Sequence, residues 1–289
     1  MVTGIVSAPW WFLAGRALRS DGLLNQAVKA DSLYARGIHA MAKDGSASIV
    51  GQFYLAAQLA SASDPRIGAR IKQLMSISES QVLQDIVCIL STNEKRGGYF
   101  VEVGVGGGKN ISNTYMLEKH FGWSGLLVEP NRSSHASIEA CRGAVLERRA
   151  AASSTGKRLT FQEVSDGGEH SRIAGTGGHP MSKDRIVEYE VETVTLDDIL
   201  RLNNAPKAID YLSLDTEGSE LDILDGLDLD TYSFQFMTIE HNFDPFVMRA
   251  LRTRFEPRGY KVVLEEFSGF DAWFVHESAP SPFRALPTA

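Results

Sequence analysis

The chain has 289 residues, of which 43% are apolar, so it is long enough to bury a full hydrophobic core in one large domain. Its formal net charge of −7 argues against a nucleic-acid partner, because phosphate binding requires a basic face. No apolar run reaches the roughly 18 uninterrupted residues that a membrane-spanning helix needs, so we expect no membrane span. Cys88 and Cys141 lie in apolar or helical segments and predict reduced thiols in a cytoplasmic protein.

Residues 1–90 are predicted to form a helical amino-terminal cap. Apolar residues recur there at helical spacing, and Asp64-Pro65 ends one segment and begins another. None of the segments carries a nucleophile or a metal-ligand spacing. We expect them to cover the site or to form a homodimer contact. The predicted helices are 25–34, 48–59, 66–75 and 81–90.

A change of pattern near residue 97 predicts an α/β domain over residues 91–278. Short β-branched runs alternate with amphipathic segments, as in a doubly wound parallel sheet. Between the third and fourth strands, the polar, glycine-rich stretch 153–184 is expected to be a mobile loop over the site. Residues 279–289 are expected to be a flexible tail. The predicted strands are 99–105, 125–129, 144–149, 209–214, 234–240, 260–265 and 272–276, and Thr195 is predicted to cap a helix before the fourth.

A glycine-rich turn follows the first predicted strand, in the segment Glu102-Val-Gly104-Val-Gly106-Gly-Gly108. Glycines let a backbone turn tightly and approach a ligand closely. A dinucleotide fingerprint requires a glycine where Lys109 stands, and a P-loop requires one where Val103 stands. Both patterns fail, which favours a ligand that has an ammonium and a ribose but no pyrophosphate. S-adenosylmethionine is such a ligand.

Glu129 ends the second predicted strand, at about the 20-residue distance where an acid can accept both ribose hydroxyls. The alternative is a glycine-rich turn without a ligand beside an exposed glutamate. The turn and the acid together favour the donor site.

The chain resembles the FkbM family of methyltransferases over residues 81–274. The family implies a Rossmann-like, seven-stranded methyltransferase sheet, S-adenosylmethionine as the donor, and commonly O-methylation of hydroxyls on secondary metabolites or sugars. The helical segment before residue 81 is not part of the resemblance. The matching blocks are Ser80-Gln-Val-Leu-Gln84-Asp85, 100–108, Ser112-Asn113-Thr114, 123–130, Thr195-Leu-Asp197-Asp198, 210–220, 239–242 and 271–274.

The resemblance also implies roles for individual residues. Glu102, Gly104 and Gly106 would line the methionine end of the donor, and Glu129 would bind its ribose. The family more often has an aspartate where this chain has Glu102. Three further polar residues would help to close the donor pocket: Gln84, Asp85 and Asn113.

The segments after the fourth and fifth strands supply the predicted catalytic residues, Asp215, Glu240 and His241. Ligands bind beyond the carboxyl ends of the strands in an open α/β sheet, so these side chains are expected to share one crevice. Asp215 would hold the donor's ammonium or the substrate, or else cap the helix near Ser219. His241 is the candidate base, because imidazole titrates near neutral pH and neighbouring acids would raise its basicity.

A magnesium site is the less favoured use of the same segments. Asp215, Glu240 and Asn242 resemble the layout of catechol-type O-methyltransferases, in which oxygen ligands hold Mg²⁺ and lower the pKa of a substrate hydroxyl. His241 is a poor magnesium ligand, however, and the FkbM resemblance implies no metal.

The predicted function is S-adenosylmethionine-dependent O-methylation of a small molecule or sugar. N-methylation of a small-molecule amine, a non-catalytic module that binds the donor, and an oxidoreductase on a similar sheet are the alternatives. The missing third glycine disfavours the oxidoreductase. The acceptor itself is not encoded in any motif.

Overall fold

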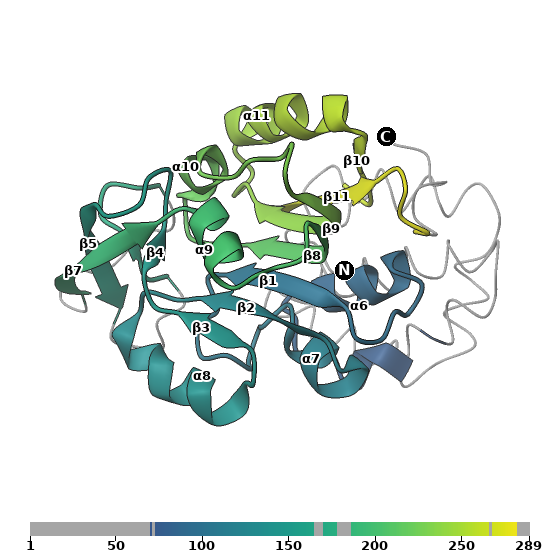
Figure 1. Cartoon of the computed structure of the whole chain (residues 1–289), viewed down its shortest axis with the longest axis horizontal. Coiled ribbons are helices and arrows are strands. Elements are labelled where there is room, and N and C mark those ends of the chain that lie inside the picture. The colour runs from purple at the N-terminus through teal and green to yellow at the C-terminus, as the bar shows by residue number, and fades with distance from the viewer. Residues whose placement is uncertain (1–69, 71–72, 165–169, 178–185, 266–267, 282–289) are drawn as a thin grey trace, which may run out of the picture. The chain divides into compact units, whose positions relative to one another are not determined.

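The computed structural model in Figure 1 describes residue 70 and residues 73–164, 170–177, 186–265 and 268–281. The chain divides into two compact units, Met1–Leu59 and Ala60–Ala289, and all described residues belong to the second. The predicted helices 25–34 and 48–59, with the homodimer contact assigned to them, lie outside the described residues. The predicted domain boundary at residue 90 stays a prediction. Within the described residues, no helix has the length and apolar character needed to cross a membrane.

The second unit is built on a seven-stranded sheet of order β10-β11-β9-β8-β1-β2-β3. The five strands from β9 to β3 are parallel, whereas β11 is antiparallel to both of its neighbours. This confirms the predicted seven-stranded α/β sheet, and every strand lies within one residue of its predicted range. The strands are β1 (Tyr99–Val103), β2 (Ser124–Val128), β3 (Val145–Glu147), β8 (Ala208–Leu214), β9 (Ser233–Glu240), β10 (Tyr260–Val262) and β11 (Asp271–His276).

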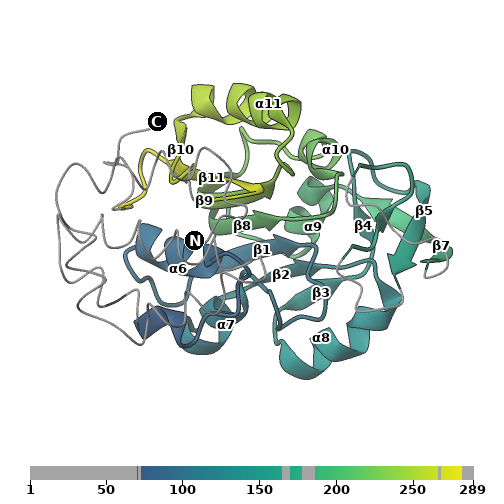
Figure 2. The same cartoon turned by 180° about the vertical axis from the view of Figure 1, so that it is seen from behind.

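Helices cover both faces of this sheet, as Figures 1 and 2 show, with α7 and α8 on one side and α10 and α11 on the other. Alternate residues of a strand point to opposite faces, so Val101 and Val103 pack with Ile199, Leu251 and Phe255 in one core. The helices are α6 (Gln84–Ser91), α7 (Tyr115–Phe121), α8 (His135–Cys141), α9 (Leu196–Leu202), α10 (Glu220–Asp225) and α11 (Pro245–Phe255), with short 3-10 turns at Arg132–Ser134 and Glu256–Arg258.

The described residues confirm two of the predicted helices. Helix α6 confirms the helix predicted at 81–90, and its residues are all buried. Thr195 caps α9 as predicted, because its side chain accepts a hydrogen bond from the Asp198 N–H at 3.1 Å. Residues 70 and 73–75, the described part of the segment predicted as helix 66–75, are helical.

The stretch 153–184 is not the structureless loop that we predicted. In its described part it contains β5 (Arg158–Val164) and β6 (Arg172–Ile173). These join β4 (Ala150–Ala151) and β7 (Ile186–Val194) in a four-stranded sheet of order β4-β7-β5-β6. The polar stretch therefore builds a wall beside the main sheet.

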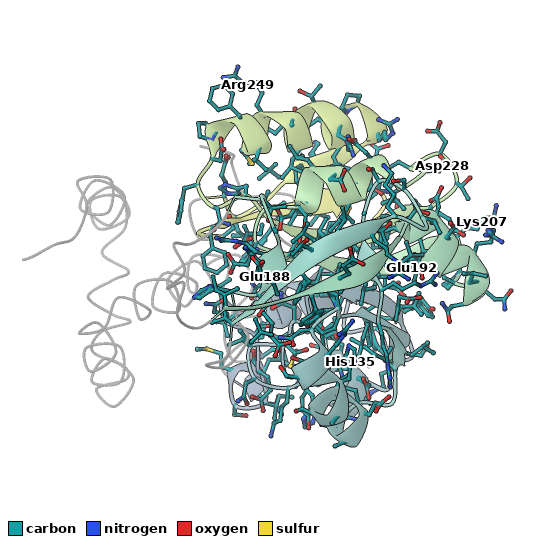
Figure 3. All side chains as sticks on the ribbon, turned by 90° about the vertical axis from the view of Figure 1, so that its left-hand side faces the viewer. His135, Glu188, Glu192, Lys207, Asp228 and Arg249 are labelled. Carbon is teal, nitrogen blue, oxygen red and sulfur yellow. The ribbon has the colours of Figure 1, made fainter. Side chains whose placement is uncertain are left out.

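The second sheet has a small apolar core. Phe161 packs on Tyr189 with ring centroids 5.6 Å apart, and both lie with Val191. The opposite face of β7 carries exposed charges, among them Glu188 and Glu192 (Figure 3). The apolar residues of β7 alternate with acids over nine residues, which is the pattern of a half-exposed strand, so this part of the second sheet carried a strand signal that our sequence analysis did not use.

Candidate functional site

A cavity of about 280 Å³ lies at the carboxyl ends of β1, β2 and β8. The strand order reverses between β1 and β8, and ligands of open α/β sheets bind at such a reversal. One side of the cavity is the glycine-rich turn with Glu129, Asp215 and Glu217. The other side is largely apolar and includes Ala150 and Phe161 from the second sheet.

The glycine-rich turn is held against the end of β8. A Cβ atom on Gly104, where φ is +83°, would lie 1.6 Å from the carbonyl oxygen of Asp215, so only glycine fits. The Gly104 N–H also donates to the Val128 carbonyl at 3.0 Å. The close approach at Gly104 is thus to the protein's own backbone. Gly106, with φ +55°, faces open space in the cavity lining and leaves room for a ligand.

Glu129 stands at the end of β2 and fixes the turn to that strand. One carboxylate oxygen accepts the N–H groups of Val105 and Gly106, both at 2.9 Å, and the other accepts the Asn131 N–H at 2.8 Å. Burial raises the pKa of Glu129 to about 6 although these hydrogen bonds oppose the shift. The side chain lines the cavity, and its contact with the donor ribose stays a prediction.

Glu102 is held inside the protein, and its side chain is not part of the cavity lining. Its carboxylate accepts the Asn113 N–H at 2.7 Å and the hydroxyls of Ser112 and Thr114. Arg142 lies 3.4 Å from it and is fully buried. Since the carboxylate has these four partners, Glu102 supports the loop before α7, and the role at the methionine end that the resemblance implies stays a prediction.

Arg142 is the centre of this support, and sequence reasoning missed it. Its guanidinium also pairs with Glu118 at 2.6 Å and donates to the Gly108 carbonyl at 3.0 Å. The end of the glycine-rich turn is thereby tied to α7. An arginine in a helix-to-strand connection gives no sequence signal that it will be buried.

The three residues implied to close the donor pocket do not line this cavity. Gln84 donates to Asp271 at 2.8 Å, and Asn113 donates to Ser213 at 2.9 Å. Asp85 accepts the Ser78 hydroxyl at 2.7 Å at the start of α6, and burial raises its pKa to about 6. The Asn113 Oδ1 atom is buried without a hydrogen-bond partner among the described residues.

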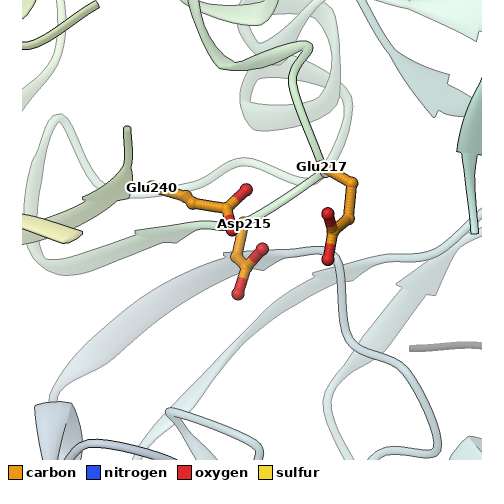
Figure 4. Close-up of side chains that lie close together, drawn as sticks. All are labelled: Asp215, Glu217 and Glu240. Carbon is orange, nitrogen blue, oxygen red and sulfur yellow. The ribbon is translucent and has the colours of Figure 1, made fainter. Parts of the chain in front are cut away.

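Three carboxylates converge beside the cavity, as Figure 4 shows. Asp215 follows β8, Glu217 follows it in the same turn, and Glu240 ends β9. One oxygen from each lies within 4.8 Å of the others. Sequence analysis brought Asp215 and Glu240 together but assigned no role to Glu217.

The acids raise one another's pKa values. Desolvation, followed by the charges of Asp271 and Glu217, raises the pKa of Asp215 well above its ordinary value. Burial and then the charge of Asp215 raise the pKa of Glu240 in the same direction. Burial also raises the pKa of Asp271 to about 7. The carboxyl ends of β8, β9 and the start of β11 therefore form a site that attracts cations.

His241 follows Glu240 but does not have the raised basicity that we predicted. Burial lowers its pKa and outweighs the nearby acids, so the imidazole is neutral at neutral pH. Its ring lies edge-on to Phe243 with centroids 6.1 Å apart, and its Nδ1 atom is buried with no hydrogen-bond partner in the described part of the chain. His241 and Asn242 both donate their backbone N–H groups to the Phe270 carbonyl. His241 is not among the residues of the cavity lining.

The second sheet, formed in part by the stretch that we predicted to lie over the site, adds residues to the cavity. Phe161, Arg172 and Ile173 all line the cavity. His170, which precedes β6, has its Nδ1 atom 3.0 Å from a carboxylate oxygen of Glu217. The alternation of Leu159 and Phe161 with polar residues was the available signal for this wall.

A doubly wound sheet with a glycine-rich turn after β1 and an acid after β2 defines the class of Rossmann-like proteins that bind an adenosine-containing cofactor. Residues 100–262 match the model of the methyltransferase FkbM domain. The chain belongs to the FkbM family and is a methyltransferase that uses S-adenosylmethionine.

Two solved structures are similar to this chain at low identity. One is described as an RNA methyltransferase from Pyrococcus horikoshii, with 10% identity, a TM-score of 0.35, and coverage of 67% of this chain and 81% of the other. The second is precorrin-6y C5,15-methyltransferase from Geobacter metallireducens, with 12% identity, a TM-score of 0.36, and coverage of 69% and 88%. No curated protein matches the chain.

Proposed function

We propose that the protein transfers a methyl group from S-adenosylmethionine to a hydroxyl group of a small molecule or sugar. The observation that supports this most directly is that Glu129, Asp215 and Glu217 line one cavity at the switch point of the sheet. The first acid suits the ribose of the donor. The other two suit a cationic donor and an acceptor hydroxyl.

The residues of the cavity fit the donor. A carboxylate offers about four acceptor positions, and Glu129 uses three of them for backbone N–H groups, which leaves capacity for a ribose hydroxyl. Gly106 carries no side chain where the donor must pass. Phe161 and Ala150 provide an apolar wall suited to adenine. When bound, the donor supplies an electrophilic methyl group on a positively charged sulfur.

The acidic cluster favours a hydroxyl over an amine as the acceptor. Carboxylates stabilise a bound amine in its ammonium form, which has no lone pair with which to attack a methyl group. For a hydroxyl, the same carboxylates of Asp215 and Glu217 are hydrogen-bond acceptors that orient the oxygen. The charge of the site therefore supports O-methylation.

His241 is the proposed acceptor of the hydroxyl proton, and because it lies outside the cavity lining, its ring must turn toward the acceptor to take that proton. Its lowered pKa keeps the imidazole neutral, and no described residue forms a hydrogen bond with its Nδ1 atom. As the acceptor oxygen bonds to the methyl carbon, the O–H bond breaks and the proton passes to the imidazole. The electron pair of the broken carbon–sulfur bond remains on sulfur. Asp215 and Glu240 would hold the acceptor while this occurs.

Calorimetric titration with S-adenosylmethionine, followed by mass-shift screening of alcohols and amines, tests the proposal. We expect donor binding by the wild-type protein, weaker binding by Glu129→Ala, and unchanged binding by the control Glu147→Gln. Glu147 ends the neighbouring strand β3 and bonds Arg149 at 2.9 Å, so it offers a carboxylate outside the cavity. A mass gain of one methyl group on an alcohol supports O-methylation. A gain on amines alone, or donor binding without turnover across the library, contradicts it.

A further inference from the structure

We propose that Asp215, Glu217 and Glu240 bind a divalent cation with oxygen ligands, Mg²⁺ or Mn²⁺. The three side chains come from the end of β8, the turn after it and the end of β9, and they point toward one another in Figure 4. One oxygen of each lies within 4.8 Å of the other two. Ligand oxygens around Mg²⁺ lie about 3–4 Å apart, so small side-chain movements complete the site.

Glu240 supplies an independent observation that the cluster is built for a ligand. This residue is only 4% exposed, and its Oε2 atom is buried without a hydrogen-bond partner among the residues that the structure describes. A buried carboxylate oxygen is unfavourable unless a donor or a cation satisfies it. The Glu240 side chain belongs to the cluster, so a cation held by the three carboxylates would give this oxygen a partner.

Two carboxylates of the cluster, Asp215 and Glu240, lie among further acids. Asp271 and Glu220 add to the negative potential on Asp215. In the part of the chain that the structure describes, no arginine or lysine forms an ion pair with Asp215 or Glu240; Arg142 and Arg149, for example, pair with Glu118 and Glu147. A divalent cation neutralises two of the carboxylates.

Glu217 takes the place that sequence analysis gave to Asn242 in its less favoured magnesium site. His170 Nδ1 lies 3.0 Å from Glu217 Oε1, and a group that contacts a metal ligand in this way orients it. Three carboxylates leave further positions of an octahedral cation for an acceptor oxygen. A hydroxyl bound there loses its proton more readily. This use of the cation rests on the proposed O-methylation, whereas cation binding itself does not.

Titration with Mn²⁺, followed by electron paramagnetic resonance, tests the site without donor or acceptor. The variants are Glu240→Gln and Glu217→Gln, and the matched control is Glu188→Gln on the exposed face of β7. We expect one bound Mn²⁺ per wild-type chain with a Kd below about 1 mM, displaced by Mg²⁺. Either cluster variant should weaken the affinity for Mn²⁺ about tenfold or more, and the control variant should leave it unchanged.

Circular dichroism identifies any variant that fails to fold. If Glu240→Gln fails to fold, Glu217→Gln tests the cation site instead. The Glu217 side chain is 10% exposed and tolerates the change more readily. Absence of Mn²⁺ binding by the wild-type protein, or equal affinity in a folded cluster variant, overturns the site. A parallel titration with S-adenosylmethionine separates the two proposals: donor binding without Mn²⁺ binding refutes the cation site alone, and Mn²⁺ binding without donor binding refutes the proposed function alone.

Discussion

Replacement of Glu129 by glutamine separates its structural role, which is to hold the glycine-rich turn, from the donor-binding role that we propose for it. The glutamine side chain has one acceptor oxygen, which can keep the Val105 and Gly106 N–H groups. Its amide group must then face the N–H of Asn131, where Glu129 now presents an oxygen at 2.8 Å. A buried donor opposite another donor costs about 1–3 kcal/mol, so we expect the free energy of unfolding to fall by that amount.

The loss of donor affinity follows from the charge. A hydrogen bond to a charged group contributes about 1.5–3 kcal/mol, and about 1.4 kcal/mol corresponds to tenfold in affinity. Glu129→Gln should therefore raise the Kd for S-adenosylmethionine by about 10- to 100-fold, measured calorimetrically at a temperature where both proteins are folded. Glu147→Gln, on the neighbouring strand, should leave the Kd unchanged.

The pH dependence of donor binding provides a second test of Glu129. Its pKa is about 6, so the wild-type carboxylate is mostly charged at pH 7 and mostly protonated at pH 5. The protonated form cannot accept as many hydrogen bonds, so wild-type affinity should fall about tenfold between these pH values. Affinity in Glu129→Gln should vary less. Equal Kd values for the two folded proteins at pH 7, with the same pH profile, would refute the ribose assignment.

Three further predictions concern stability. Arg142→Met should lower the free energy of unfolding by about 3–5 kcal/mol in urea titration, because it leaves the buried Glu102 and the partly buried Glu118 without their cation; a change below about 1 kcal/mol would contradict the network. Gly104→Ala should yield little folded protein on expression, because its Cβ meets the Asp215 carbonyl, whereas Gly106→Ala meets open space and should lose only about 1–2 kcal/mol; similar yields would contradict this packing. Asp85, whose pKa rises on folding from 3.8 to about 6, binds its proton more tightly in the folded state, so its contribution is most favourable below pH 4 and is lost as the pH rises through 6. Stability of Asp85→Asn relative to wild type should therefore increase by up to about 3 kcal/mol from pH 4 to pH 7, and a constant difference would contradict it.

The main sheet was predictable because its strands are buried on both faces. β1, β2, β8 and β9 are short apolar runs, which distinguish them from the helices around them. Once the sheet is known, the rule that ligands bind at the carboxyl ends locates Glu129, Asp215 and Glu240 at one edge. This part of the site could therefore be predicted without knowledge of any side-chain contact.

The second sheet and the partners of individual acids were not predictable in the same way. β5 and β7 bury few side chains, and although their apolar residues alternate with polar ones, the polar, glycine-rich stretch between the two strands has the composition of a loop. The position of Glu102, two residues before the first glycine of the turn, is visible in the sequence. The orientation of its side chain depends on the hydroxyls of Ser112 and Thr114, which come from a separate loop. The spacing of residues in the sequence predicts at which end of a strand an acid lies. It does not predict which hydrogen-bond donors surround that acid in the folded protein.

The residues that form the cavity are also those that join its strands. Glu129 ties the glycine-rich turn to β2, and the absence of a side chain at Gly104 lets the same turn lie against Asp215 at the end of β8. The turn proposed to meet the donor and the acids proposed to meet the acceptor are consequently fixed relative to each other by backbone contacts. A rigid connection of this kind favours methyl transfer, because an in-line displacement depends on the alignment of donor and acceptor. It also means that a variant at this edge changes folding and affinity together, so only a comparison with a folded variant of a neighbouring acid, such as Glu147→Gln, isolates the chemistry.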